Sequence, residues 1–72
     1  MRSVTANGQD ISIEKVDFGG FLEDGTIVYC VKLNGLEIGQ FNKKKDAVRL
    51  ATLTCQALDQ KDIDIYIGAF ND

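Results

Sequence analysis

Residues 26–42 read Thr-Ile-Val-Tyr-Cys-Val-Lys-Leu-Asn-Gly-Leu-Glu-Ile-Gly-Gln-Phe-Asn, and this stretch decides the fold. Two β-rich runs flank Asn34-Gly35, and Asn-Gly between such runs is the strongest short-range signal for a β-hairpin. A type I′ turn needs positive φ at both central residues, which Asn and Gly adopt at the least cost. We therefore expect a hairpin that turns at Asn34 and Gly35.

The hairpin also predicts which side chains share a face of the sheet. Regular pairing outward from the turn opposes Leu33–Leu36, Lys32–Glu37, Val31–Ile38, Cys30–Gly39, Tyr29–Gln40 and Val28–Phe41. Since side chains alternate along a strand, the core face is expected to hold Ile27, Tyr29, Val31, Leu33, Leu36 and Ile38. The opposite, outer face then carries a Lys32–Glu37 ion pair, with Val28, Cys30 and Phe41 beyond it.

The segment before the hairpin predicts one more strand. Residues 1–9 read as a polar lead with a turn at Asn7-Gly8, and alternating apolar residues predict a strand over residues 10–18. The apolar residues stand at odd positions up to Ile13 and at an even position at Val16, which indicates a bulge or the end of the strand near Lys15. Glu23-Asp24-Gly25 predicts a further turn, and the glycine pair before it a strand-linking bend.

The segment after the hairpin predicts a helix and then a strand. Asn42 is a suitable N-cap for a helix that runs to residue 59 or 60. Its apolar stripe is expected to comprise Ala47, Leu50, Ala51, Thr54 and Leu58, and its solvent side Lys45, Arg49, Thr52, Gln56 and Gln60. Strict alternation over residues 63–68, Ile-Asp-Ile-Tyr-Ile-Gly, predicts a last strand.

Together these elements predict one small α+β domain over residues 1–72. The expected order is β-β-β-α-β: an antiparallel three-stranded meander, one amphipathic helix on one sheet face, and a C-terminal strand reached by a right-handed crossover. That strand pairs with either the first or the third strand; the first leaves the hairpin intact.

Composition excludes several functions. The chain has eight basic and eleven acidic residues, a net charge of −3 and no histidine. Without histidine or a phosphate-binding or nucleophile motif, we expect no enzyme activity and no cofactor. Cys30 and Cys55 cannot complete a zinc site, and we expect two reduced, separate thiols. No apolar run approaches the ~20 residues that span a bilayer, so we expect a cytoplasmic protein without a membrane partner.

Three groups of residues are candidate sites. Val28, Cys30 and Phe41 form an expected apolar patch on the outer face, and such patches commonly mark a partner or a self-association site. Lys43, Lys44 and Lys45, followed by Arg49, place cations in the first turn of the helix, where they oppose its dipole and suit an anion or nucleic acid. Asp59, Asp62 and Asp64 form an acidic cluster near the helix end, for which a solvated turn is the simplest interpretation.

The residues 29–41, Tyr-Cys-Val-Lys-Leu-Asn-Gly-Leu-Glu-Ile-Gly-Gln-Phe, run directly into Lys43-Lys-Lys-Asp-Ala47. Over residues 10–60 this outline resembles the small DNA-binding modules of phage integrase N-termini and AP2-type factors. The resemblance implies DNA binding through the sheet face away from the helix. Here that face offers Lys32, neutralised by Glu37, together with Val28, Cys30 and Phe41, where such a module needs Arg and Lys.

Small size, acidity and the missing catalytic groups resemble instead the small inhibitor and host-takeover proteins of phages and mobile elements, including anti-CRISPR proteins. That resemblance implies an inhibitor or regulator of a nucleic-acid-handling protein, with the acidic residues 59–64 as mimics of phosphates. We therefore expect a non-catalytic protein-binding module. The alternatives are a DNA-binding module that uses the lysine patch, and a homodimer that pairs outer sheet faces or edge strands.

Overall fold

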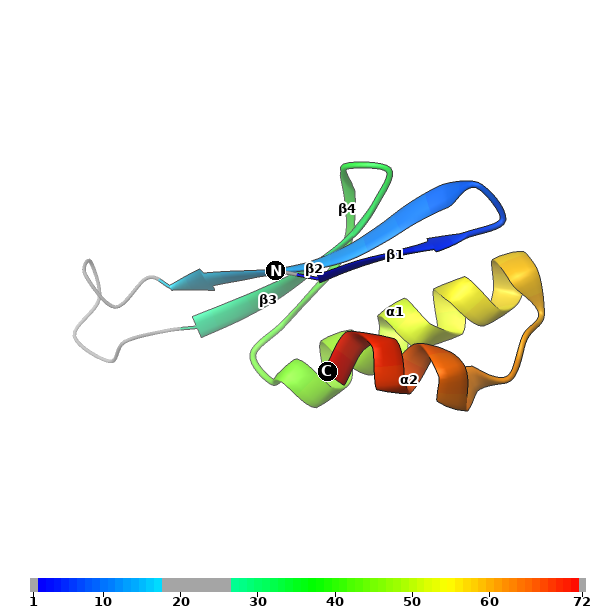
Figure 1. Cartoon of the computed structure of the whole chain (residues 1–72). Helices are drawn as coiled ribbons and strands as arrows, with labels where there is room; N and C mark the ends of the chain where they lie inside the picture. The colour runs from blue at the N-terminus through cyan, green and yellow to red at the C-terminus, as the bar shows by residue number, and fades with distance from the viewer. Residues whose placement is uncertain (1, 18–26, 72) are drawn as a thin grey trace.

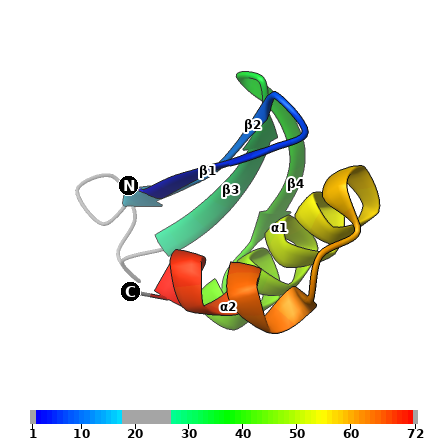
Figure 2. The same ribbon diagram turned by 45° about the vertical axis from the view of Figure 1, so that its right-hand side comes forward.

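A computed structural model describes residues 2–17 and 27–71. The chain forms one sheet and two helices in the order β1 (Arg2–Ala6), β2 (Gln9–Asp17), β3 (Ile27–Leu33), β4 (Leu36–Phe41), α1 (Lys44–Asp59) and α2 (Ile63–Asn71) (Figure 1). The strands lie in the order β1-β2-β3-β4, and every pair is antiparallel. Both helices lie on the same side of the sheet (Figure 2). The predicted α+β class is confirmed, but the predicted order of elements is wrong at both ends.

The first difference is β1, a strand where the sequence predicted a polar lead. Arg2–Ala6 pairs with β2 across a turn at Asn7 and Gly8, whose φ values are 53° and 76°. The positive φ at both positions is the signature of a type I′ hairpin. Val4 and Ala6 pack against the core from this strand. Two apolar residues are too few to make such a short strand evident from alternation.

The central hairpin forms as predicted at its turn but not at its far end. Asn34 and Gly35 have φ values of 51° and 87°, and the pairs Leu33–Leu36 and Lys32–Glu37 are confirmed. Between Lys32 and Val31 the register then shifts, so that the opposed pairs become Val31–Gly39, Cys30–Gln40 and Tyr29–Phe41. This bulge adds one residue to β4, and every later side chain of β4 therefore changes its face.

The β2–β3 register is continuous, by contrast. It runs without a shift from Ile11–Leu33 to Asp17–Ile27. The predicted bulge near Lys15 is therefore wrong, and Val16 belongs to the face opposite Ile11 and Ile13. The predicted turn at Glu23-Asp24-Gly25 and the bend before it lie outside the described residues.

Helix α1 spans the predicted residues, but the side of the helix that is buried differs from the predicted one. Its N-cap is Lys43, which makes no side-chain capping bond, so the prediction of Asn42 is wrong. The buried residues are Ala47, Val48, Ala51, Thr52 and Cys55. Thr52, predicted on the solvent side, is only 1% exposed, and its hydroxyl donates to the Arg49 carbonyl at 3.0 Å. The reason is α2, which packs along α1 and gives it a second buried side.

Helix α2 replaces the predicted last strand. Tyr66 and Phe70, four residues apart, point into the core, and the Asp62 carboxylate accepts a hydrogen bond from the Asp64 backbone N–H at 3.1 Å at the start of the helix. The apolar residues alternate at 63, 65 and 67, but they also recur at 63, 66, 67 and 70, which is the helical spacing. Because β1 occupies the free edge of β2, the expected place beside the first strand is taken.

The core lies between the sheet and the two helices. It is formed by buried side chains from β1, β2, β3, α1 and α2, namely Ala6, Ile11, Ile13, Val31, Ala47, Val48, Ala51, Cys55, Tyr66 and Phe70. Among the described residues, no helix is long and apolar enough to cross a bilayer.

Candidate functional site

The predicted apolar patch on the outer sheet face does not form. The bulge turns Phe41 to the helix side, where it pairs with Tyr29 and packs against the core. Val28 stays on the outer face and is half-buried. Cys30 is only 6% exposed, although neither α1 nor α2 covers this face. The three predicted residues are therefore not one surface, and Phe41 has to be considered together with α1.

Polar side chains cover Cys30 instead. Lys32 Nζ donates to Glu14 Oε2 at 2.5 Å, and Gln40 Nε2 donates to Glu37 Oε1 at 3.0 Å. The predicted partner of Lys32 was Glu37, so this pairing is a correction. Burial, and then the neighbouring Glu37, raise the pKa of the Cys30 thiol. This part of the outer face is thus a closed layer of polar groups above a protonated thiol.

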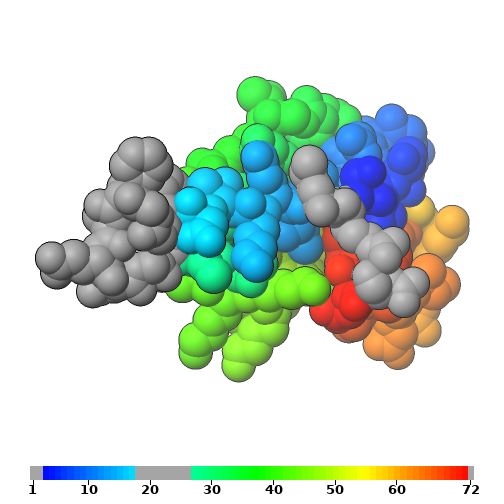
Figure 3. Space-filling view, turned by 60° about the vertical axis from the view of Figure 1, so that its left-hand side comes forward, coloured from blue at the N-terminus to red at the C-terminus, as the bar shows by residue number. Residues whose placement is uncertain are grey.

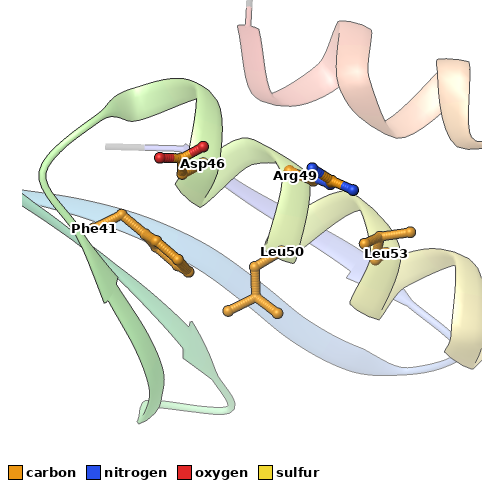
Figure 4. Close-up of a pocket in the computed structure, with 5 residues that line it drawn as sticks. All are labelled: Phe41, Asp46, Arg49, Leu50 and Leu53. Carbon is orange, nitrogen blue, oxygen red and sulfur yellow. The ribbon is translucent and has the colours of Figure 1, made fainter.

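Exposed large apolar side chains lie on β4 and α1, and two more, Ile65 and Ile67, lie on α2. Leu36 is 75% exposed and Ile38 42%, both on β4, and Leu53 on α1 is 44% exposed. Leu53 also lines an open pocket of about 280 Å³ between β4 and α1, together with Phe41, Asp46, Arg49 and Leu50 (Figure 4). In Figure 4, Phe41 and Leu50 point toward each other from the strand and the helix. We call this pocket, together with Leu36 and Ile38, the β4–α1 surface.

Strand β4 is also an edge of the sheet. Among the described residues it pairs with β3 alone, so the backbone groups on its other side have no strand partner. Natural edge strands are commonly protected by lysine, proline or a bulge. Here the bulge is present, but the six residues of β4 include a single charged side chain, Glu37, and no proline. An accessible edge therefore borders the apolar pocket.

The basic residues lie at the same end of this surface. Lys43 is the N-cap of α1, Lys44 and Lys45 form its first turn, and all three are exposed. Arg49, one turn later, lines the pocket with Phe41. In the space-filling view of Figure 3, the first part of α1 (yellow-green) projects below the strands. The structure thus brings Phe41 of the predicted apolar patch together with Arg49 of the predicted basic patch, while Val28 and Cys30 lie on the other face of the sheet.

The acidic residues do not form one patch. The Asp59 side chain is mostly buried and lies 3.7 Å from Lys61 Nζ, whereas Asp62 caps α2 and Asp64 is exposed in its first turn. In the part of the chain that the structure describes, no group of three His, Cys, Asp or Glu side chains is placed to hold a metal ion.

Two titratable groups are buried between the helices and the sheet. Burial, and to a smaller extent Asp59, raise the pKa of Cys55 to about 11 and that of Tyr66 to about 12. The Tyr66 hydroxyl is buried and meets hydrogen-bond geometry with no described residue, although Asp59 lies near enough to raise its pKa. Both cysteines are free thiols. Near neutral pH these groups are therefore protonated, and neither lines the pocket.

Sequence reasoning missed most of the apolar residues of the β4–α1 surface. Leu36 and Ile38 were predicted on the core face and Leu50 in the buried stripe of the helix, and Leu53 was not among the predicted site residues. One signal was present: Gly39 directly follows Ile38, and a glycine within a strand often marks a bulge.

The chain was also compared with known proteins. No protein family, curated protein or solved structure matches it. The predicted succession of three strands and a helix is present as β2, β3, β4 and α1, with β1 and α2 in addition. On the outer sheet face, Lys32 is paired with Glu14 and lies close to Glu37.

Proposed function

We propose that this chain is a non-catalytic protein-binding module that docks through the β4–α1 surface. The observation that carries the proposal is an apolar pocket, lined in part by the exposed Leu53, whose lining residue Phe41 belongs to the same edge strand as the exposed Ile38. Contiguous apolar surface of this kind commonly marks a protein interface. An inhibitor or regulator of its partner needs no chemistry of its own beyond such a contact.

Energetics favour the apolar side chains over the lysines as the source of affinity. Complete burial of one leucine or isoleucine contributes about 1.5–3 kcal/mol. An exposed ion pair contributes about 0–1 kcal/mol. Leu36, Ile38 and Leu53 together therefore outweigh Lys43, Lys44 and Lys45, whose main effect is on the rate and orientation of association.

A site-specific photo-crosslinker tests this proposal. It is placed at Ile38 or Leu53 in the full chain and, as a control, at Ile65, an exposed apolar residue of α2. In an extract of the organism that encodes the chain, we expect one protein to crosslink at positions 38 and 53 and not at 65. Equal crosslinking at all three positions, or none at 38 and 53, contradicts the proposal.

The same experiment separates the alternatives. A crosslinked species of twice the mass of the chain identifies a homodimer. Crosslinks that are removed by nuclease identify nucleic acid as the partner. If the affinity for DNA then falls steeply with salt and is lost in the double variant Lys43→Glu, Lys44→Glu, the lysine patch is the DNA-binding site.

A further inference from the structure

We propose that the partner contributes an extended strand that pairs antiparallel with β4, and that this strand carries acidic residues at its N-terminal end and alternating apolar residues after them. The inference rests on the proposed function and names the chemistry of the partner at the same surface. It is carried by three features: the free edge of β4, the size of the pocket, and the distribution of charge around α1.

The free edge favours a strand over a helix or a flat surface. The outer backbone groups of β4 have no strand partner among the described residues, and an added strand satisfies them by hydrogen bonds. Every strand pair in this sheet is antiparallel, and an antiparallel fifth strand continues the pattern. The exposed Leu36 and Ile38 then lie against side chains of the new strand.

The pocket is suited to one side chain of that strand. Its volume of about 280 Å³ falls just below the range of about 300–1,000 Å³ that is typical of small-molecule sites. Phe41, Leu50 and Leu53 line it on the helix side of the sheet. Because side chains alternate along a strand, every second residue of the added strand points toward this side, and one apolar residue can fill the pocket.

The positive charge at the start of α1 determines which end of the partner's strand is expected to be acidic. Residues 41–53 contain four basic residues and one acidic residue, in a chain whose net charge is −3. Strand β4 runs toward α1, so an antiparallel partner has its N-terminal end beside Lys43, Lys44 and Lys45. Acidic residues at that end match the local positive charge and fix the direction of the strand.

A second copy of this chain fits the surface less well. A two-fold pair of β4 strands over their full length places the partner's Glu37 opposite Gly39 or Phe41, short of the lysines. A second β4 has no other carboxylate, so the basic residues are left without a counterpart. The charge distribution therefore favours a different protein segment.

Selection from a library of random twelve-residue peptides, displayed on phage and bound to the folded 72-residue chain, tests the inference. We expect the selected peptides to share two or three acidic residues followed by alternating apolar residues. Their binding should protect amides of β4 from hydrogen exchange and should shift the amide resonances of the first turn of α1.

Matched variants locate the binding. We expect Leu53→Glu to weaken the selected peptides at least tenfold, and Ile65→Glu on α2 to leave their affinity unchanged. Lys44→Glu with Lys45→Glu should weaken acidic peptides several-fold at low salt and much less at high salt.

The outcomes separate this inference from the proposed function. Suppose that the selected peptides depend on Leu53 and yet bind as helices, leave the β4 amides unprotected or lack the acidic end. Any of these results overturns the strand inference but is consistent with the protein-binding function. If no selected peptide depends on Leu53, or if only self-association depends on it, the result overturns both.

Discussion

Gly39 in β4 and Leu50 in α1 lie so close together that a Cβ atom on residue 39 would be 2.6 Å from Leu50 Cδ2. The same atom would be 3.1 Å from the Phe41 ring. Glycine at this position therefore permits the close approach of the helix to the edge strand. It also connects the bulge to the pocket, since Leu50 and Phe41 both line the pocket.

Gly39→Ala is expected to lower the free energy of unfolding by about 1–3 kcal/mol, because Leu50 and Phe41 must move to accommodate the methyl group. Urea unfolding measures the change. Leu50→Ala in the same chain should reduce this penalty, since the closest atom is then absent. The control is Gly68→Ala in α2, where a Cβ meets nothing within 4 Å; this change should stabilise by up to about 1 kcal/mol. Equal stability of Gly39→Ala and the wild type would show that the close approach is not a constraint.

Tyr66→Phe is expected to leave the melting temperature unchanged or to raise it, because the change removes a buried hydroxyl that forms no hydrogen bond with a described residue. Calorimetry or thermal circular dichroism measures the effect. Phe70→Ala, one helical turn later in the same core, should by contrast cost about 3–5 kcal/mol through the cavity that it leaves. A clearly lower melting temperature for Tyr66→Phe would indicate that the hydroxyl has a stabilising partner.

Stability is expected to fall at alkaline pH. The pKa is raised from 9.0 to about 11 for Cys55 and from 10.0 to about 12 for Tyr66. The unfolded chain therefore loses these protons at a lower pH than the folded chain. Their contribution to stability is complete below about pH 9 and decreases as the pH rises toward 11 and 12.

Urea midpoints at pH 8, 9, 10 and 10.5 test this dependence. They should be constant up to about pH 8 and then decrease, more steeply above pH 10, where Tyr66 adds to Cys55. Tyr66→Phe should remove the additional slope above pH 10 and leave the slope between 9 and 10. Identical pH profiles for the two proteins would exclude Tyr66 as a source of the dependence.

The ion pair on the outer face is expected to involve Glu14 and not Glu37. Lys32 Nζ lies 2.5 Å from Glu14 Oε2, whereas Glu37 accepts from Gln40. In double-mutant cycles with Lys32→Met, we expect a larger coupling with Glu14→Gln than with Glu37→Gln, and the coupling should decrease with added salt. A larger coupling with Glu37 would support the regular register that the sequence predicted.

Local turn chemistry made the central part of the fold predictable. Asn34-Gly35 specified the β3–β4 turn and its first two residue pairs through the need for positive φ. Asn7-Gly8 contained the same information, but only Val4 and Ala6 indicated the strand before it. The candidate site was predictable in part: Phe41 and Arg49 were named, whereas the surface that joins them to Ile38, Leu50 and Leu53 was not.

The sequence alone determined the two turns, the span of β2 and β3, and the existence of α1, because each depends on backbone preferences or on a periodicity within one segment. Tertiary structure decided the rest. The apolar residues of 63–70 fit both the strand and the helix period. They form α2 because β1 already occupies the edge beside β2, and because a helix lets Tyr66 and Phe70 reach the core. The bulge in β4 likewise places Gly39 where Leu50 of α1 and the Phe41 ring leave little room for a side chain. Pairing partners and close approaches between distant segments are not encoded in any one segment, and they determine which apolar side chains remain exposed.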